Sequence, residues 1–235
     1  MTRAPAAPRG RRGFVRRGPT AGPLALRPDV HAARVGDDIV FLDVAADAYS
    51  CLPGAAGVIA LGPDGSVGVT DAEVGDHLLR SGLCRTGPAM GGPRRQAPPV
   101  RATLSPHAPR PIRPRHLADA LAATADVARR YRGRSFADLL AAAGPAPSPL
   151  PAPDRALAKL VADFHAWAPY APIPGKCLVR SFVLRRWLAR RGHGSLWVFG
   201  VATWPFRAHC WLQCGEVALD DVPERLQAFR PILVL

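Results

Sequence analysis

Several features that would define a protein class are missing from this sequence of 235 residues. It contains no apolar run of about 18 residues, so we expect no membrane-spanning helix. The Arg-rich segment 9–17 is not followed by an apolar stretch, which argues against a secretory signal. No glycine-rich phosphate-binding loop is present, so we do not expect the chain to hydrolyse ATP.

Lysine is also scarce. Lys159 and Lys176 are the only two among 31 basic residues, and the formal net charge is +13. A chain rich in Arg, Ala and Pro is typical of a GC-rich genome, so this charge is weak evidence for a nucleic-acid partner. The five cysteines are odd in number and irregularly spaced, which indicates reduced thiols in a cytoplasmic protein. The spacing of Cys210 and Cys214 matches no zinc pattern, and we expect neither a metal nor another cofactor.

The 26 prolines and 22 glycines are unevenly distributed and divide the chain into four parts. Residues 1–28 are rich in Arg, Pro and Gly and predict a disordered basic tail. Residues 29–88 predict a small domain, and 89–113 predict a Pro- and Arg-rich linker. The remainder, 114–235, predicts a larger domain.

The small domain shows strand-like and helical patterns. We expect three strands at 30–35, 39–44 and 47–52, of which the first two form a hairpin with Gly36 in its turn. Two helices are expected after them, at 55–61 and 70–81. Thr70 and Glu73 have the spacing of a capping box, which predicts the start of the second helix.

The residue pattern of the larger domain predicts four helices followed by three strands. The helices are expected at 116–132, 135–143, 154–167 and 177–191, and the strands at 195–203, 208–214 and 216–221. Leu117 and Leu121 fall on the expected apolar face of the first helix. The pairs Arg185–Arg186 and Arg190–Arg191 are interpreted as a solvated face of the fourth helix.

The fourth helix and the strands after it carry a candidate catalytic site. Cys177 lies at the expected start of the helix, where unpaired backbone amides and the helix dipole favour a thiolate. His209 lies on a following strand, and Asp220 and Asp221 close the next one. A thiol, an imidazole and a carboxylate in this order are what a cysteine nucleophile needs. Strand alternation favours Asp221, but Asp220 stays open as the third residue.

The C-terminal third resembles the B protein of lasso peptide biosynthesis. The resemblance rests on residues 177–192, Phe199-Gly-Val, Phe206-Arg-Ala-His-Cys-Trp and Asp220-Asp221. It implies a leader peptidase with a transglutaminase-like, papain-related fold, in which Cys177 is the nucleophile and His209 the base. The family usually has a small residue such as Ala after the His, where this chain has Cys210.

Residues 30–53 are similar to the small precursor-recognition domain of the PqqD-like type. The two resemblances together imply an α+β protein, with a winged-helix-type recognition domain before the peptidase domain. Such a domain binds a leader peptide as an added strand. By this analogy the leader-contacting residues are expected to be Val40, Tyr49, Cys51 and Leu78. The implied partners are a ribosomally made precursor peptide and a separate, ATP-dependent lasso cyclase.

Two other classes of function stay open from the sequence. The chain would be a non-catalytic adaptor if Cys177 were a structural thiol and the small domain only presented a peptide. Alternatively, the small domain would be a winged-helix module that binds nucleic acid, with the positive charge supplying phosphate affinity.

Overall fold

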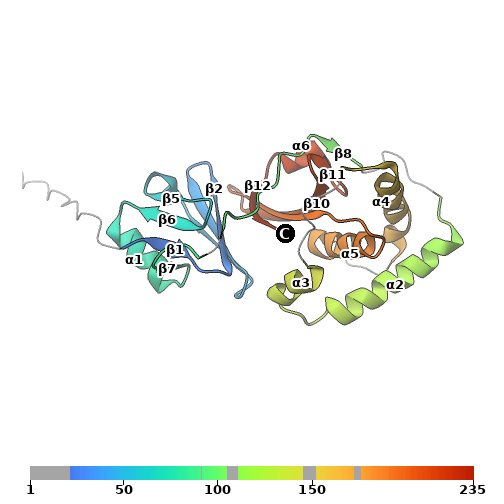
Figure 1. Cartoon of the computed structure of the whole chain (residues 1–235), viewed down its shortest axis with the longest axis horizontal. Helices are drawn as coiled ribbons and strands as arrows, with labels where there is room; N and C mark the ends of the chain where they lie inside the picture. Colours follow the sequence, from blue (N-terminus) through green and yellow to red (C-terminus); the bar gives the residue numbers. More distant parts are fainter. Residues whose placement is uncertain (1–21, 91, 105–110, 145–151, 172–175) are drawn as a thin grey trace, which may run out of the picture.

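The computed structural model describes residues 22–90, 92–104, 111–144, 152–171 and 176–235. The described chain forms two lobes, an N-terminal one made mainly of strands and a larger one in which helices cover a sheet (Figure 1). The mixed helix and sheet architecture agrees with the α+β expectation. None of the helices in the described ranges combines the length and apolar character that crossing a bilayer requires.

The N-terminal lobe contains two antiparallel sheets and one α-helix, α1 (Ala72–Arg80). The first sheet has the order β2-β3-β4, with bounds Val30–Val35, Asp38–Asp43 and Ala48–Leu52, so the three predicted strands are confirmed. The second has the order β5-β6-β1-β7, with bounds Ile59–Leu61, Ser66–Val69, Leu24–Leu26 and Cys84–Thr86.

Three local predictions in this lobe are wrong. Residues 55–61 form a 3-10 turn, Ala55–Gly57, followed by strand β5 instead of a helix. The side chain of Asp71, not Thr70, caps α1 by accepting from the amides of Glu73 and Val74. Residues 24–26, inside the segment predicted to be a disordered tail, form strand β1. They are ordered because all three are buried and pair with β6 on one side and β7 on the other.

The larger lobe is built on a five-stranded sheet of order β12-β9-β10-β11-β8. The bounds are Arg230–Val234, Leu196–Ala202, Arg207–Cys214, Val217–Ala218 and Ala102–Thr103. Strand β8 lies in the predicted linker and pairs parallel to β11, while the Pro98 carbonyl accepts a bond of 2.9 Å from Gln213 Nε2. Residues 98–104 of the predicted linker therefore pack on this sheet, whereas Arg94 donates to the Val30 carbonyl of the small lobe, so these described residues do not form a free tether.

The helices of this lobe are α2 (Pro114–Arg130), α3 (Phe136–Ala143), α4 (Arg155–Trp167), α5 (Cys177–Ala189) and the short α6 (Pro223–Leu226). A 3-10 turn, Ala168–Tyr170, follows α4. Helices α3 and α4 begin as predicted, since Ser135 and Asp154 accept hydrogen bonds from their first-turn amides.

Helix α2 buries a different face from the one predicted. Leu117 and Leu121 are 65% and 64% exposed, whereas Ala120, Ala123 and Val127 are buried. The helix packs against α4 and α5, and small side chains on its inner face let these helices approach closely. Contact with neighbouring helices, rather than side-chain size, therefore decided which face of α2 is inside.

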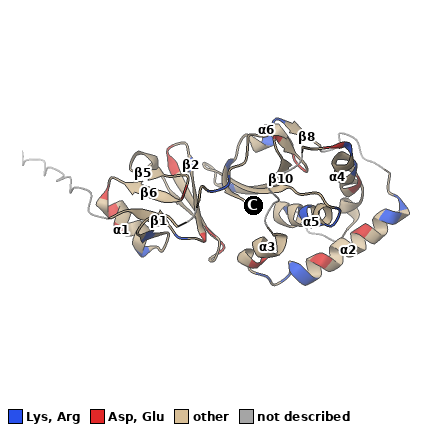
Figure 2. Ribbon diagram, viewed as in Figure 1, with Lys and Arg blue, Asp and Glu red and all other residues tan. Residues whose placement is uncertain are grey.

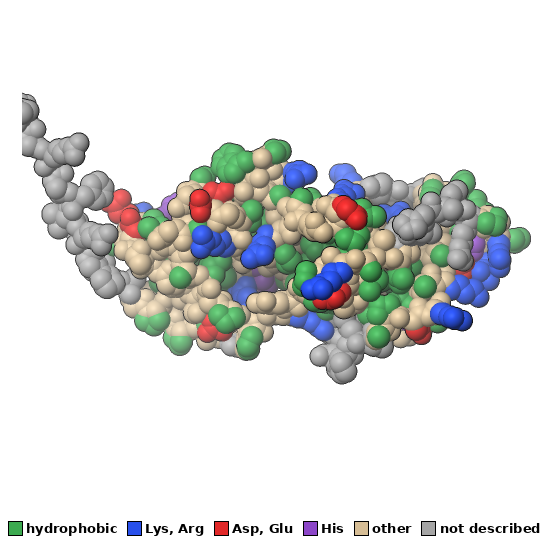
Figure 3. Space-filling model, turned by 90° about the horizontal axis from the view of Figure 1, so that it is seen from above, with side chains coloured by type: hydrophobic (Ala, Val, Ile, Leu, Met, Phe, Trp, Pro, Cys, Tyr) green, Lys and Arg blue, Asp and Glu red, His purple; other side chains and the backbone are tan. Residues whose placement is uncertain are grey.

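The pair Arg185–Arg186 is not part of a solvated face, whereas Arg190 and Arg191, just after the end of α5, are exposed as predicted and pair with carboxylates of α2. Charges of both signs lie along the neighbouring helix α2 (Figure 2), and its Asp126 pairs with Arg186 at 2.5 Å and with Arg190 at 2.8 Å. Arg185 is buried and donates from Nη1 to the Ser195 carbonyl at 2.8 Å. On the face drawn in Figure 3, basic side chains lie in separate groups among hydrophobic ones.

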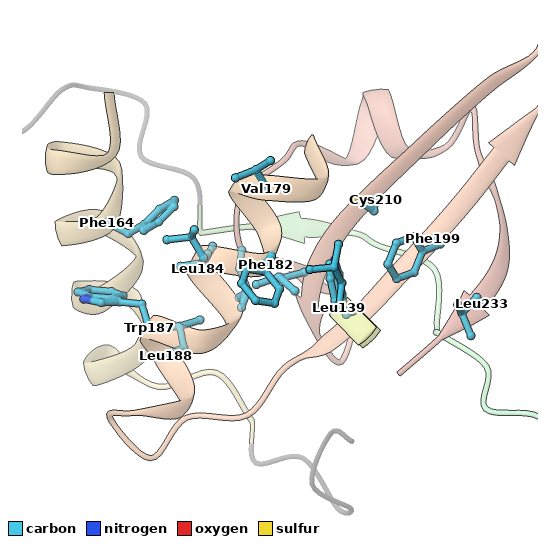
Figure 4. Packing of buried hydrophobic residues seen from close by; sticks show 14 of the residues in the cluster. Leu139, Phe164, Val179, Phe182, Leu184, Trp187, Leu188, Phe199, Cys210 and Leu233 are labelled. Carbon is cyan, nitrogen blue, oxygen red and sulfur yellow. The ribbon is translucent and has the colours of Figure 1, made fainter. Parts of the chain in front are cut away.

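Helix α5 lies between helices α2 and α4 and the sheet, and it carries the centre of the hydrophobic core. Phe182, Leu184 and Leu188 are fully buried and pack with Phe164 of α4 on one side and Phe199 of β9 on the other (Figure 4). This packing holds α5 at a defined position over β10. The first residue of the helix is therefore held in place by the core behind it.

The two lobes share this core. Val40 and Leu42 of β3 belong to the same cluster as α5, although their neighbours Ile39 and Phe41 face the N-terminal core. Trp204 in the turn between β9 and β10 donates from Nε1 to Asp38 at 2.8 Å. The three-stranded sheet thus has a buried layer on each face, and it fixes the small lobe against the larger one.

Candidate active site

Cys177 is the first residue of α5, as the sequence predicts. Its N-cap, Lys176, makes no side-chain capping bond, so the first amides of the helix are free of such a partner. The Cys177 carbonyl accepts a bond of 2.8 Å from Ser181 Oγ one turn later. The thiol is therefore placed where the helix dipole favours a negative charge, at a half-buried position.

Strand β10 supplies the imidazole. Its side chains alternate as predicted: Cys210, Leu212 and Cys214 join the core around α5, while Trp211 packs in a separate cluster on the other face. His209 is buried, and its ring stacks on Trp211 with centroids 6.1 Å apart. The neighbouring strand β11 pairs only with Gln213 and Cys214, so the earlier residues of β10 lie beyond that pairing.

His209 joins the thiol to a carboxylate. Its Nε2 lies 2.6 Å from Oδ2 of Asp221, and its side chain is hydrogen-bonded to Cys177. Because Nε2 faces the carboxylate, Nδ1 is the ring nitrogen that remains for the thiol. Asp221 is itself held by the amide of Val222, at 2.9 Å. The structure therefore brings Cys177, His209 and Asp221 into one chain of contacts.

The geometry separates the two candidate aspartates. Asp220 accepts from the amide of Leu212 at 3.1 Å and is half-buried. Burial raises the pKa of Asp220 to about 6, whereas the hydrogen bond to His209 outweighs burial and lowers the pKa of Asp221. Asp221 is thus the residue in contact with His209, and Asp220 tethers the turn after β11 to β10.

The contacts favour an ion pair between the thiol and the imidazole. Hydrogen bonds from the Cys210 side chain and from His209 outweigh burial and lower the pKa of Cys177 to about 4. Burial alone would lower the pKa of His209, but the bonds to Asp221 and Cys177 raise it to about 9. Both shifts act in the direction that makes a thiolate and an imidazolium at neutral pH.

Cys210 is a part of this site to which the sequence analysis assigned no catalytic role. Its sulfur lies 3.4 Å from Ser181 Oγ, and both its side chain and its amide are bonded to Cys177. The contact with Cys177, together with burial, raises the pKa of Cys210. The signal was present in the sequence, since strand alternation places the residue after His209 on the face toward α5.

The predicted leader-contacting residues do not form one surface. Val40 and Leu78 are fully buried in the two cores, so neither presents a surface to a peptide in this conformation. Tyr49 and Cys51 are half-buried on β4, and the Tyr49 ring packs on Phe206 with centroids 5.5 Å apart. Among the described residues, no group of three or more His, Cys, Asp or Glu side chains is arranged to hold a metal ion.

Comparison with known proteins gives the family of the larger lobe. The family model described as the transglutaminase-like superfamily matches residues 92–234, which is more than half of the chain. No curated protein sequence and no solved structure matches the chain. The matched segment begins within the predicted linker and contains Cys177, His209 and Asp221. The chain therefore belongs to the transglutaminase-like superfamily.

Proposed function

We propose that this protein is a cysteine peptidase that removes the leader from a ribosomally made lasso precursor peptide. The observation that carries the proposal is the chain of contacts from Cys177 through His209 to Asp221. The superfamily match is consistent with cysteine chemistry of this kind, and the resemblance to lasso B proteins supplies the finer assignment.

In the proposed reaction the Cys177 thiolate attacks the scissile carbonyl carbon. The backbone amide of Cys177, at the start of α5, donates to the developing oxyanion. The intermediate collapses to a thioester, and the leaving amine takes its proton from the His209 imidazolium. Neutral His209 then accepts a proton from water as the water attacks the thioester, which releases the leader carboxylate and restores the ion pair. Asp221 keeps the His209 ring oriented throughout.

The small lobe suits recognition of an extended peptide. Within the described chain, β4 pairs only with β3 and is therefore an edge of its sheet. An extended leader would add to such an edge through main-chain hydrogen bonds. Tyr49 on β4 lies close enough to Cys177 for the charge of that thiolate to add to the burial that raises the pKa of Tyr49 to about 12. A peptide added along β4 would thus be led toward the nucleophile, and the freed core would pass to a separate ATP-dependent cyclase.

The test is mass spectrometry of a candidate precursor encoded beside this gene. The precursor is incubated with wild-type protein, with Cys177→Ala, and with Cys84→Ala, whose thiol lies in the N-terminal core. We expect one cut by the wild type and by Cys84→Ala and none by Cys177→Ala, with and without the neighbouring cyclase. A product carrying an added amine in place of water would instead indicate acyl transfer. Binding of the precursor without any cut would refute the peptidase and identify an adaptor.

A further inference from the structure

A cavity of about 290 Å³ opens on the seam between the two lobes, against Leu178, the residue that follows Cys177 in α5. It is lined by Asp47, Tyr131, Arg132, Gly133, Arg134, Phe136, Leu139 and Leu178. Its volume lies at or below the lower end of the range of about 300–1,000 Å³ that small-molecule sites occupy. The cavity therefore has the size for one large side chain rather than for a free cofactor.

The cavity has an apolar interior and a charged rim. Phe136 and Leu139 of α3 are buried, and the half-buried side chains of Tyr131 and Leu178 complete the apolar walls. The Tyr131 ring is itself fixed edge-on against Phe182, with centroids 5.9 Å apart. The exposed charges at the rim are Asp47, Arg132 and Arg134. An apolar side chain would be enclosed at the base, while the rim charges stay in water.

Two observations place the cavity next to the reacting atoms. Leu178 follows Cys177 directly on α5, so the wall and the nucleophile belong to the same helical turn. The charges of Cys177 and Asp47 both reach the Tyr131 hydroxyl, where they add to burial in raising its pKa. One wall of the cavity therefore faces both the catalytic cysteine and the small lobe.

We propose that this cavity is the specificity pocket of the peptidase and takes a large aliphatic or aromatic side chain of the substrate next to the scissile bond. The inference rests on the proposed function for the peptide nature of the substrate, and it adds which residue class is selected. Asp47 comes from the turn between β3 and β4, whereas the other lining residues come from the larger lobe. The pocket is thus complete only when the two lobes are packed together.

The test uses peptidyl vinyl sulfones that differ only in the side chain next to the electrophile: Ala, Leu, Phe, Asp or Lys. Intact-mass spectrometry follows modification of Cys177, and each rate is divided by the rate with iodoacetamide, which reports the thiolate alone. Leu178→Trp fills the pocket. Leu121→Trp is the matched control, because Leu121 is exposed on α2 and does not line the cavity.

We expect the wild type and Leu121→Trp to react at least about tenfold faster with the Leu and Phe probes than with the Ala probe. Leu178→Trp should lose this preference and keep its iodoacetamide rate. Equal rates for all probes with the wild type, or an unchanged preference in Leu178→Trp, would overturn the proposal.

A second readout does not depend on thiol chemistry. Saturation-transfer NMR on Cys177→Ala should show stronger contact for an acetylated Phe amide than for the Ala amide, and Leu178→Trp in the same background should abolish the difference. Equal signals for the Phe and Ala amides on Cys177→Ala would also overturn the proposal that this cavity is a specificity pocket. Side-chain selectivity without cleavage of any precursor would refute the leader-peptidase function and leave the pocket standing, so the two failures are distinguishable.

Discussion

Replacing Asp221 with Asn tests whether this carboxylate controls the imidazole of His209, the base in the proposed reaction. The change keeps the size of the side chain but removes the negative charge 2.6 Å from His209 Nε2. In the wild type the pKa of His209 is raised from 6.5 to about 9 although burial acts in the opposite direction. That difference corresponds to about 3 kcal/mol in favour of the imidazolium. Without the charge of Asp221, burial is opposed by Cys177 alone.

The pH profile of the reaction should show directly how the pKa of His209 changes when the charge of Asp221 is removed. The reactive ion pair needs an ionised Cys177, with a pKa of about 4, and a protonated His209, with a pKa of about 9. Wild-type kcat/KM should therefore rise through the lower value, stay level between them and fall through the higher one. In Asp221→Asn the alkaline limb should move toward neutral pH, and kcat/KM at pH 8 should drop by about 10²-fold or more.

The assay is the pH dependence of precursor cleavage, with iodoacetamide labelling of Cys177 measured over the same range. Asp220→Asn is the matched control, because it makes the same chemical change at the adjacent residue, which contacts Leu212 and not His209. An alkaline limb at the same pH in Asp221→Asn and wild type would refute the reasoning. An equal displacement in Asp220→Asn would show that general charge, not the contact, sets the pKa of His209.

Three further changes give independent tests. Cys210→Ala removes a hydrogen bond to Cys177 and should raise the pKa of that thiol, which the acidic limb of iodoacetamide labelling measures; an unmoved limb would contradict the contact. The pKa of Asp220 is about 6 in the folded protein and 3.8 in an ordinary carboxyl group, so between these values the folded protein binds the extra proton. The contribution of Asp220 to the free energy of unfolding therefore falls as pH rises from 4 to 6. Asp220→Asn should flatten this dependence in urea unfolding measured at each pH, and an unchanged slope would count against it. Arg185→Ala should lower the free energy of unfolding by about 2–4 kcal/mol, because it leaves the buried Ser195 carbonyl without its donor; exposed Arg129→Ala should change it by less than about 0.5 kcal/mol.

Local patterns predicted the elements that carry the candidate site. The start of α5 at Cys177 followed from a helical pattern that ends near Gly192, whose φ is +80°. The alternation along β10 predicted that His209 and Cys210 point to opposite faces. These properties depend on neighbouring residues along the chain, which one sequence contains in full.

Short elements depended on distant partners and were missed. Strand β1 has three residues and β8 has two, and each exists because another strand lies beside it. Neither is long enough to show a hydrophobic period of its own. For the same reason the sequence placed β1 in a tail and β8 in a linker.

The sequence by itself determined the order of the thiol, the imidazole and the acidic pair, as well as the periodic helices and strands that carry them. The tertiary structure alone decided that Asp221 and not Asp220 meets His209, since the turn after β11 directs one carboxylate to the ring and the other to the Leu212 amide. It also decided that Cys210 contacts Cys177 and that Leu178 and Asp47 share a cavity. Periodicity reports which face of an element a side chain occupies, but only packing brings the faces of distant elements together.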